Sequence, residues 1–352
     1  MLTVSWSTFS VFVSRTNVRL SNISAGGEPA SPSSAVWVPD ASPLAHPRTR
    51  RLPIRHEGNP VNPNNQPPGP LRAAATAPSS ATPASAEVER TIIAYNDVQI
   101  ETLSQGHGSV IVILPSLGRA AEDYDDVAPR LTAAGFRVLR PQPRGIGESK
   151  GPMDQLDMHA FAADVAAVLD HEQAGPAVVV GHAWGSQPAR MLAQDRPDLV
   201  RGLVMAAASA GKLPPESTEK PYGRLREAID GAGDLSLPEA QRLRYLRQAF
   251  FAPGHDPRPW LTGWFPETHR AQAHARNVTP VDAYFAGGTV PMLDLQAQFD
   301  AVVVPDIFKP MLGERVTVSV IPDAGHALAP EQPAAMSEAV ADFARRLSGT
   351  GR

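Results

Sequence analysis

The chain has 352 residues, of which 42% are hydrophobic, so it can bury a sizeable core. It contains no cysteine, which excludes disulfides, thiolate metal sites and cysteine nucleophiles. Its formal net charge of −4 does not favour nucleic acid as a partner. No apolar run reaches the length of about 18 residues that a membrane span needs.

Residues 1–86 are expected to form a disordered tail rather than a domain. They are rich in Pro, Ser, Ala and Arg, a composition with little apolar surface to offset the entropy lost on ordering. Because the tail has more arginines than acidic residues, it also has the character of a targeting segment. We expect a cytoplasmic protein. Secretion or import into an organelle, directed by this tail, is the alternative.

Regular structure is predicted to begin near residue 87 with a hairpin. The segments Arg90–Tyr95 and Val98–Leu103 are rich in β-forming residues and flank the polar pair Asn96-Asp97. The continuous apolar run Val110–Leu114 follows, and it predicts a strand buried on both faces, as in a parallel sheet.

Helices and strands then alternate along the chain. Helical spacing of apolar residues is found at residues 121–134, 159–171 and 183–195, and apolar strand-like runs at 136–139, 177–180 and 199–205. This alternation predicts an α/β fold, with a mostly parallel twisted sheet and helices on both of its faces.

The alternation stops at residues 211–288, which are predicted to be helical, and resumes with strands at 292–295 and 316–321 and helices at 305–312 and 331–347. An insertion between two parts of one sheet is typical of a lid. We therefore expect residues 87–210 and 289–349 to form the core and 211–288 a helical lid. Four large aromatic residues of this lid are candidates to line a pocket, namely Trp260, Trp264, Phe265 and Tyr284.

The segment Gly181-His-Ala-Trp-Gly185 lies between a predicted strand and a predicted helix. Glycines at this spacing allow a sharp turn in which strand and helix approach closely. This is the context of the nucleophile elbow G-x-S-x-G, with Ala183 at the position of the nucleophile. A methyl group has no lone pair and no proton to lose, so Ala183 cannot form a covalent enzyme intermediate.

Over residues 88–348 the chain resembles the α/β-hydrolase superfamily, in particular its lid-bearing esterases, epoxide hydrolases and haloalkane dehalogenases. The segment Arg140–Ser149 is similar to the family's D-x-R-G-x-G-x-S loop, with Gln142 in place of the aspartate. Gly325-His326 is similar to the loop of the catalytic histidine, and Leu295–Asp300 to the loop that supplies the acid. The order of elbow, acid and histidine along the chain is the order found in the family.

The resemblance implies that His326 is a general base, since the pKa of histidine, about 6.5, suits proton transfer near neutral pH. It implies that Asp300 accepts a hydrogen bond from the imidazole and fixes its tautomer. Asp294, within the preceding strand, is the rival acid.

The resemblance also implies an oxyanion hole made by the backbone N–H groups of Leu117 and Trp184. The segment Pro115-Ser116-Leu117-Gly118 stands here where the family usually has His-Gly, and both expected donors keep their N–H group. Ser116 and Ser186 are the nearby hydroxyls that could replace the missing nucleophile. No metal site and no cofactor are expected, because no pair of histidines has ligand spacing and no phosphate-binding loop follows the first buried strand.

Three hypotheses about function follow. The first is an enzyme that acts on a small, largely apolar organic molecule through a His-Asp general base, as a hydrolase, a lyase or a cofactor-free oxygenase. The second is a non-catalytic protein that binds such a molecule, and the third is a serine hydrolase whose nucleophile has been substituted. The sequence favours the first, because the histidine, the candidate acid and the glycines all remain around Ala183. It leaves the oligomeric state open.

Overall fold

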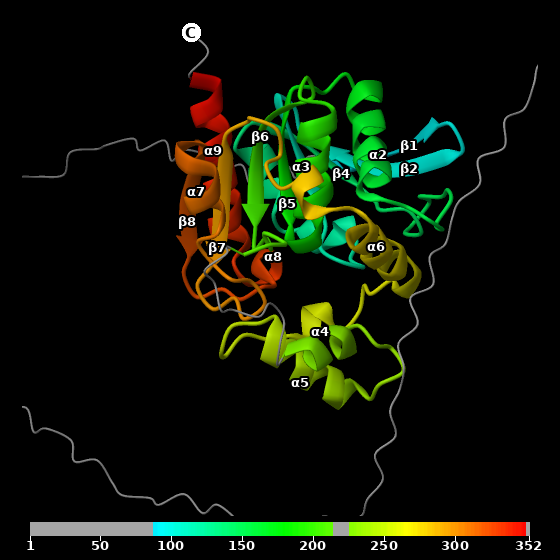
Figure 1. Cartoon of the computed structure of the whole chain (residues 1–352), viewed down its shortest axis with the longest axis vertical. Coiled ribbons are helices and arrows are strands. Elements are labelled where there is room, and N and C mark those ends of the chain that lie inside the picture. Colours follow the sequence, from blue (N-terminus) through cyan, green and yellow to red (C-terminus); the bar gives the residue numbers. More distant parts are fainter. Residues whose placement is uncertain (1–86, 214–224, 350–352) are drawn as a thin grey trace, which may run out of the picture. The chain divides into compact units, whose positions relative to one another are not determined.

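The computed structural model describes residues 87–213 and 225–349, so the predicted tail lies outside the described residues. The described strands form one sheet of order β1-β2-β4-β3-β5-β6-β7-β8 (Figure 1). Their bounds are β1 Glu89–Tyr95, β2 Val98–Gln105, β3 Ser109–Leu114, β4 Phe136–Pro141, β5 Ala177–His182, β6 Val200–Ala206, β7 Met292–Ala297 and β8 Val316–Ile321.

The predicted hairpin is present as β1 and β2, which pair antiparallel with Tyr95 opposite Val98. Asn96 turns the chain between them with φ +47°, a conformation that asparagine tolerates better than most residues. Strand β2 also runs antiparallel to β4, and every other neighbouring pair in the sheet is parallel. The prediction of a mostly parallel α/β sheet is therefore confirmed.

Helices cover both faces of this sheet (Figure 1). Side chains of α2 (Met158–His171) and α3 (Ser186–Asp195) pack in one core cluster, and those of α1 (Ala128–Ala133) and α9 (Pro333–Gly349) pack in another. Successive residues of a strand point to opposite faces, so Val179 belongs to the first cluster and Val180 to the second. The continuous apolar runs of the sequence reflect this burial on both faces.

Two predicted helices differ from the observed ones. The helix expected at 121–134 is divided into a 3-10 turn, η1 (Ala121–Tyr124), and α1, in whose first turn Pro129 lies. Proline has no N–H to donate and is tolerated only in the first turn of a helix, so α1 begins anew there. The helix expected at 305–312 is shortened to α7 (Phe308–Leu312), because Asp306 has φ +58° and cannot belong to a right-handed helix.

The described residues between β6 and β7 contain helices and no strand. They form α4 (Arg226–Ala232), α5 (Glu239–Ala249), η4 (Arg258–Trp260), α6 (Pro266–Val278) and η5 (Val281–Ala283), and η6 (Gly313–Arg315) and α8 (Leu328–Glu331) follow later in the chain. We call residues 225–283 the α4–α6 segment. Within the described ranges no helix is long and apolar enough to cross a membrane.

Arg119 holds the α4–α6 segment against the core. Its guanidinium lies 4.8 Å from the ring centroids of both Trp260 and Trp264. The same group donates a hydrogen bond of 2.6 Å to the carbonyl oxygen of Thr262 and a bidentate pair to Asp123. A cation between two indole rings gains a further cation–π attraction, so this segment is fixed firmly at its middle.

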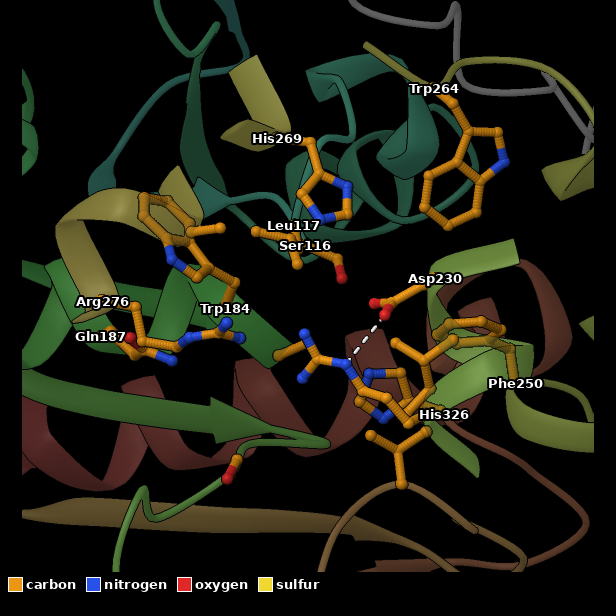
Figure 2. A pocket seen from close by; sticks show the side chains of 16 residues that line it. Ser116, Leu117, Trp184, Gln187, Asp230, Phe250, Trp264, His269, Arg276 and His326 are labelled. Atoms are coloured by element: carbon orange, nitrogen blue, oxygen red, sulfur yellow. Dashed lines mark hydrogen bonds and ion pairs between the residues drawn. The ribbon is translucent and has the colours of Figure 1, made fainter. Parts of the chain in front are cut away.

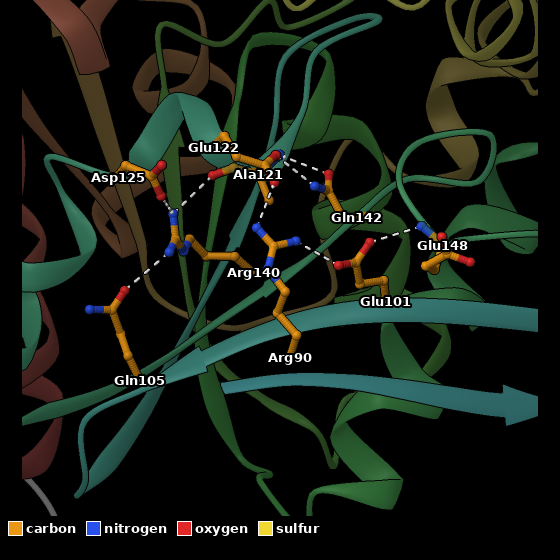
Figure 3. Close-up of polar contacts among 9 residues, drawn as sticks. All are labelled: Arg90, Glu101, Gln105, Ala121, Glu122, Asp125, Arg140, Gln142 and Glu148. Carbon is orange, nitrogen blue, oxygen red and sulfur yellow. Dashed lines mark hydrogen bonds and ion pairs between the residues drawn. The ribbon is translucent and has the colours of Figure 1, made fainter. Parts of the chain in front are cut away.

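Polar contacts at the ends of β2 and β4 fix η1 (Figure 3). Gln142 accepts a hydrogen bond from the Ala121 N–H at 2.9 Å and donates one to Glu122 at 2.6 Å. The buried Arg140 donates to the carbonyl oxygen of Ala121 at 3.1 Å. The family's aspartate in place of Gln142 would only accept hydrogen bonds when ionised, whereas the amide does both. The result is a rigid η1 directly after the loop that contains Ser116.

A buried ion pair connects the loop after β4 to α2. Arg144 donates to both oxygens of Asp164, at 2.8 and 2.9 Å, and neither side chain is more than 7% exposed. The hydroxyl of Tyr95 on β1 also donates to Asp164, so three elements meet at one carboxylate. Because both charges are desolvated, each depends on the other for stabilisation.

We expect Arg144→Met to lower the free energy of unfolding by about 3–5 kcal/mol, because it leaves the carboxylate of Asp164 buried without a cation. Urea denaturation followed by circular dichroism measures this loss. Lys150→Met is the control, since Lys150 pairs with Glu148 in the solvent and should leave the midpoint close to that of the unmodified chain. Equal midpoints for the two variants would show that the buried pair contributes little.

Candidate active site

The turn at Ala183 is sharp and allows no larger residues at its two glycines. Ala183 follows β5, begins the 3-10 turn η2 (Ala183–Gly185) and has φ +49°, which is rare for a residue with a side chain. A Cβ atom on Gly181 would lie 2.4 Å from the Cα atom of Ser186, and one on Gly185 would lie 2.4 Å from the carbonyl oxygen of Leu114. The strand, the turn and α3 therefore touch backbone to backbone, and the methyl group of Ala183 lies on a pocket wall.

His326 lines the same pocket as Ala183, and its imidazole is hydrogen-bonded to Asp300, which lines a different pocket. The Nδ1 atom of His326 lies 3.0 Å from Oδ2 of Asp300, and both side chains are buried. Asp300 is itself held by the backbone N–H groups of Val302 and Val303, at 2.8 and 3.1 Å from its Oδ1. A carboxylate only accepts hydrogen bonds, so Nδ1 carries the proton and Nε2 keeps its lone pair. Among the described residues, Nε2 has no hydrogen-bond partner.

The rival acid, Asp294, does not contact His326. It lies on β7, is 4% exposed and accepts a hydrogen bond of 2.8 Å from the amide of Gln296. Burial raises the pKa of Asp294 to about 6. Of the two candidates, the structure brings Asp300 to the imidazole.

A second imidazole, that of His182, connects the turn to the loop of His326. Its Nε2 lies 2.8 Å from the carbonyl oxygen of His326, and its Nδ1 lies 2.8 Å from the hydroxyl of Tyr124. The carbonyl only accepts, so Nε2 donates and Nδ1 accepts from the tyrosine. Burial lowers the pKa of His182 to about 3, which keeps this imidazole neutral. The sequence interpretation gave His182 no role, although its position next to Ala183 was a signal.

The loop predicted to hold the oxyanion donors is fixed by α6. The Gly118 N–H donates to the side-chain oxygen of Gln272 at 2.7 Å, and the Gly118 carbonyl accepts from the Phe265 N–H at 3.0 Å. The indole of Trp184 donates to the backbone carbonyl of Gln272 at 3.2 Å. Leu117 and Trp184 both line the pocket, so the structure places the two predicted donor residues on one cavity.

The two serines considered as substitutes for the nucleophile differ in position. Ser186 is fully buried, and its hydroxyl donates to the carbonyl oxygen of Ala183 at 2.7 Å, which points it into the helix. Ser116 lines the pocket and is 5% exposed. Ser186 is thus excluded as a group that reaches a substrate.

The pocket lies between the core and the α4–α6 segment (Figure 2), and its cavity volume is about 100 Å³. Among the described residues, no group of three or more His, Cys, Asp or Glu side chains could hold a metal ion. The apolar part of the wall includes Leu117, Trp184, Ile229, Phe250, Trp264 and Val302.

Of the four aromatic residues expected to line the pocket, one does so in the structure. Trp264 lines it, whereas Trp260 is 1% exposed and packs in the core of the α4–α6 segment. Tyr284 lines a neighbouring pocket, and Phe265 lines neither. Phe250, at the end of α5, is on the wall and stacks near the ring of His326 with centroids 5.6 Å apart.

Polar residues of α6 were missed by the sequence interpretation. Two of them, His269 and Arg276, line the pocket from this helix, and Ala273 lines it between them, four residues after His269 and three before Arg276. Residues at such spacings share one face of a helix, so the periodicity of α6 was the available signal. Burial lowers the pKa of His269, which favours its neutral form.

Comparisons with known proteins agree with this architecture. The family described as "alpha/beta hydrolase fold" matches residues 109–249. A pyrethroid hydrolase of Sphingobium wenxiniae is 31% identical over 252 residues, which are 67% of this chain and 87% of that enzyme. Epoxide hydrolase A of Mycobacterium tuberculosis is 34% identical over 131 residues, which are 35% of this chain and 41% of that enzyme.

Among solved structures, an esterase of Exiguobacterium antarcticum has the same fold. It superposes with a TM-score of 0.60 at 17% identity, over 72% of this chain and 98% of the esterase. The parallel sheet with its antiparallel first strands, the helices on both faces and the similarity to the pyrethroid hydrolase lead to one assignment. The chain belongs to the α/β-hydrolase family.

Proposed function

We propose that the chain is an enzyme that hydrolyses a small, largely apolar organic molecule without forming a covalent enzyme intermediate. One observation carries this proposal: His326, hydrogen-bonded to Asp300, lines a pocket that Ala183 also lines. The base and its acid are thus in place where the residue at the turn cannot act as a nucleophile. Hydrolysis is the favoured reaction because the relatives carry the names of hydrolases.

In this mechanism water is the nucleophile. Nε2 of His326 takes a proton from a water molecule while the oxygen of that water forms a bond to the electrophilic carbon of the substrate. Asp300 stabilises the imidazolium that results and keeps the ring oriented. The imidazolium then returns the proton to the leaving group as its bond to carbon breaks.

The negative charge that develops on the substrate needs fixed donors. The backbone N–H groups of Leu117 and Trp184 are proposed to form this oxyanion hole, because both residues line the pocket and their loops are fixed by Gln272. Donors that are already oriented stabilise such a charge without reorganising. We assign the α4–α6 segment the role of a lid that shields this charge from water.

We expect His326→Ala to lower kcat/KM for the best substrate of a panel of esters, epoxides and haloalkanes by about 10²- to 10⁴-fold, because the variant loses the general base. Initial rates near neutral pH measure this loss. His159→Ala is the control, since His159 is exposed on α2 and pairs with Asp195 outside the pocket. Unchanged turnover in His326→Ala would exclude the proposed mechanism, whereas no turnover of any panel substrate by the unmodified chain would favour a binding protein.

The same assay distinguishes the roles of Asp300 and Asp294. We expect Asp300→Asn to lower kcat by about 10²-fold or more, because an amide lets the imidazole adopt the wrong tautomer. Asp294→Asn should leave kcat within about threefold, since Asp294 contacts Gln296 and not His326. A loss in Asp294→Asn that matches the loss in Asp300→Asn would contradict the assignment of the acid.

We expect Ala183→Ser to react with a fluorophosphonate probe that leaves the unmodified chain unlabelled, because the new hydroxyl would lie at the turn beside the base. Labelling is read by mass spectrometry, and the double variant Ala183→Ser/His326→Ala should lose it. Absence of labelling in the single variant would show that the turn and the base are not aligned. Ester hydrolysis confined to Ala183→Ser, with an inactive unmodified chain, would instead favour a serine hydrolase with a substituted nucleophile.

A further inference from the structure

We infer that the ligand of this pocket carries a carboxylate and that the guanidinium of Arg276 binds it. The inference rests on the proposed function for the location of the reacting group, near Ala183 and His326. It adds a substrate class, namely apolar molecules with one negatively charged end.

Arg276 is a cation that has no anion beside it among the described residues. It is half-buried on α6 and lines the pocket, and among the described residues it has no hydrogen-bond or ion-pair partner. Other arginines near the site are paired: Arg119 with Asp123, Arg144 with Asp164 and Arg226 with Asp230. Placing a guanidinium in a partly desolvated wall costs free energy unless an anion or an acceptor meets it.

Two neutral residues with donor groups, Gln187 and Ser209, line the same pocket as Arg276. Gln187 is 5% exposed, and its side-chain oxygen accepts a hydrogen bond from the hydroxyl of Tyr284 at 3.4 Å. That contact leaves the amide NH₂ group of Gln187 without a partner among the described residues. Figure 2 shows Arg276 and Gln187 on the side of the pocket away from Phe250 and His326. Ser209 lines the same two neighbouring pockets as Arg276 and Gln187, so these three residues mark one region.

The charges around the pocket favour an anion at this region. Asp230 is the acidic residue of the lining, and Arg226 neutralises it at 2.8 Å. His269 is mostly neutral because burial lowers its pKa. Arg276 is therefore the uncompensated charge of the described lining. Its planar fork of donors matches a carboxylate, which accepts two parallel hydrogen bonds.

One unpaired guanidinium with two neutral donors fits a singly charged carboxylate better than a phosphate, which carries more charge and usually meets more than one cation. The remaining wall is apolar, with Leu117, Ile229 and Trp264 among its residues. The ligand that fits is a molecule with an apolar body, a carboxylate at the Arg276 end and a hydrolysable group near His326.

Binding of matched acids and amides tests this inference without any need for turnover. The probes are 4-phenylbutyrate with 4-phenylbutyramide and hexanoate with hexanamide, titrated at neutral pH. Binding is followed by the tryptophan fluorescence of the chain, to which Trp184 and Trp264 on the pocket wall contribute. We expect each acid to bind about 10- to 100-fold more tightly than its amide, since the charged hydrogen bonds form only with the carboxylate. Arg276→Gln should reduce this ratio to about one, and Arg276→Lys should restore part of it because the charge returns without the planar fork.

Arg258→Gln is the matched control, because Arg258 is exposed, pairs with Asp256 and lies outside the pocket, so the ratio should not change. Equal binding of acids and amides by the unmodified chain, no binding of either, or an unchanged ratio in Arg276→Gln would overturn the inference. His326→Ala separates it from the proposed function. That variant should keep the preference for acids while it loses turnover, so failure of the mechanism and failure of the carboxylate site give different results.

Discussion

The two hydrogen bonds of the His182 imidazole hold together the three segments that form the site. Through its backbone His182 belongs to the turn at Ala183, through Nε2 it binds the loop of His326, and through Nδ1 it binds Tyr124 on η1. A buried imidazole costs free energy unless both nitrogens have partners, so none of the three segments can shift alone. With a pKa of about 3, His182 stays neutral at working pH, and its donor and acceptor do not exchange roles.

The loop of His326 is held from a second side by the α4–α6 segment. Glu331 accepts hydrogen bonds from the backbone N–H groups of Ala252 and Gly325, at 2.7 and 2.8 Å. The Ala327 N–H donates to the carbonyl oxygen of Phe250 at 2.8 Å, and a Cβ atom on Gly325 would lie 2.7 Å from the nitrogen of Ala252. The end of α5 therefore packs directly on the backbone that carries the proposed base. A change in this segment is transmitted to the orientation of His326, even though α5 supplies no proton-transfer group.

The sheet was predictable because buried parallel strands have continuous apolar runs, and β3, β5 and β6 follow that rule. The pairing of His326 with Asp300 was predictable only through the resemblance to a family, since 26 residues separate them along the chain. The choice of Asp300 over Asp294 needed the fold, which places Asp294 beside Gln296. The place of Arg276 on the pocket wall escaped prediction because a lone arginine on an amphipathic helix is usually solvated. Its lack of a partner among the described residues depends on how the α4–α6 segment packs.

The backbone at Ala183 is strained, and the turn orients a neighbouring group although it carries no nucleophile. A left-handed conformation costs a residue with a side chain about 1–3 kcal/mol and persists where the surroundings enforce it. Here the contacts of Gly181 and Gly185 enforce it, although the methyl group does no chemistry. The same turn sets the direction of the Trp184 N–H, which the proposed mechanism uses as an oxyanion donor. The indole of Trp184 is also bound to Gln272 on α6, so the strained turn fixes this proposed donor relative to α6. That effect of the turn does not depend on a serine hydroxyl.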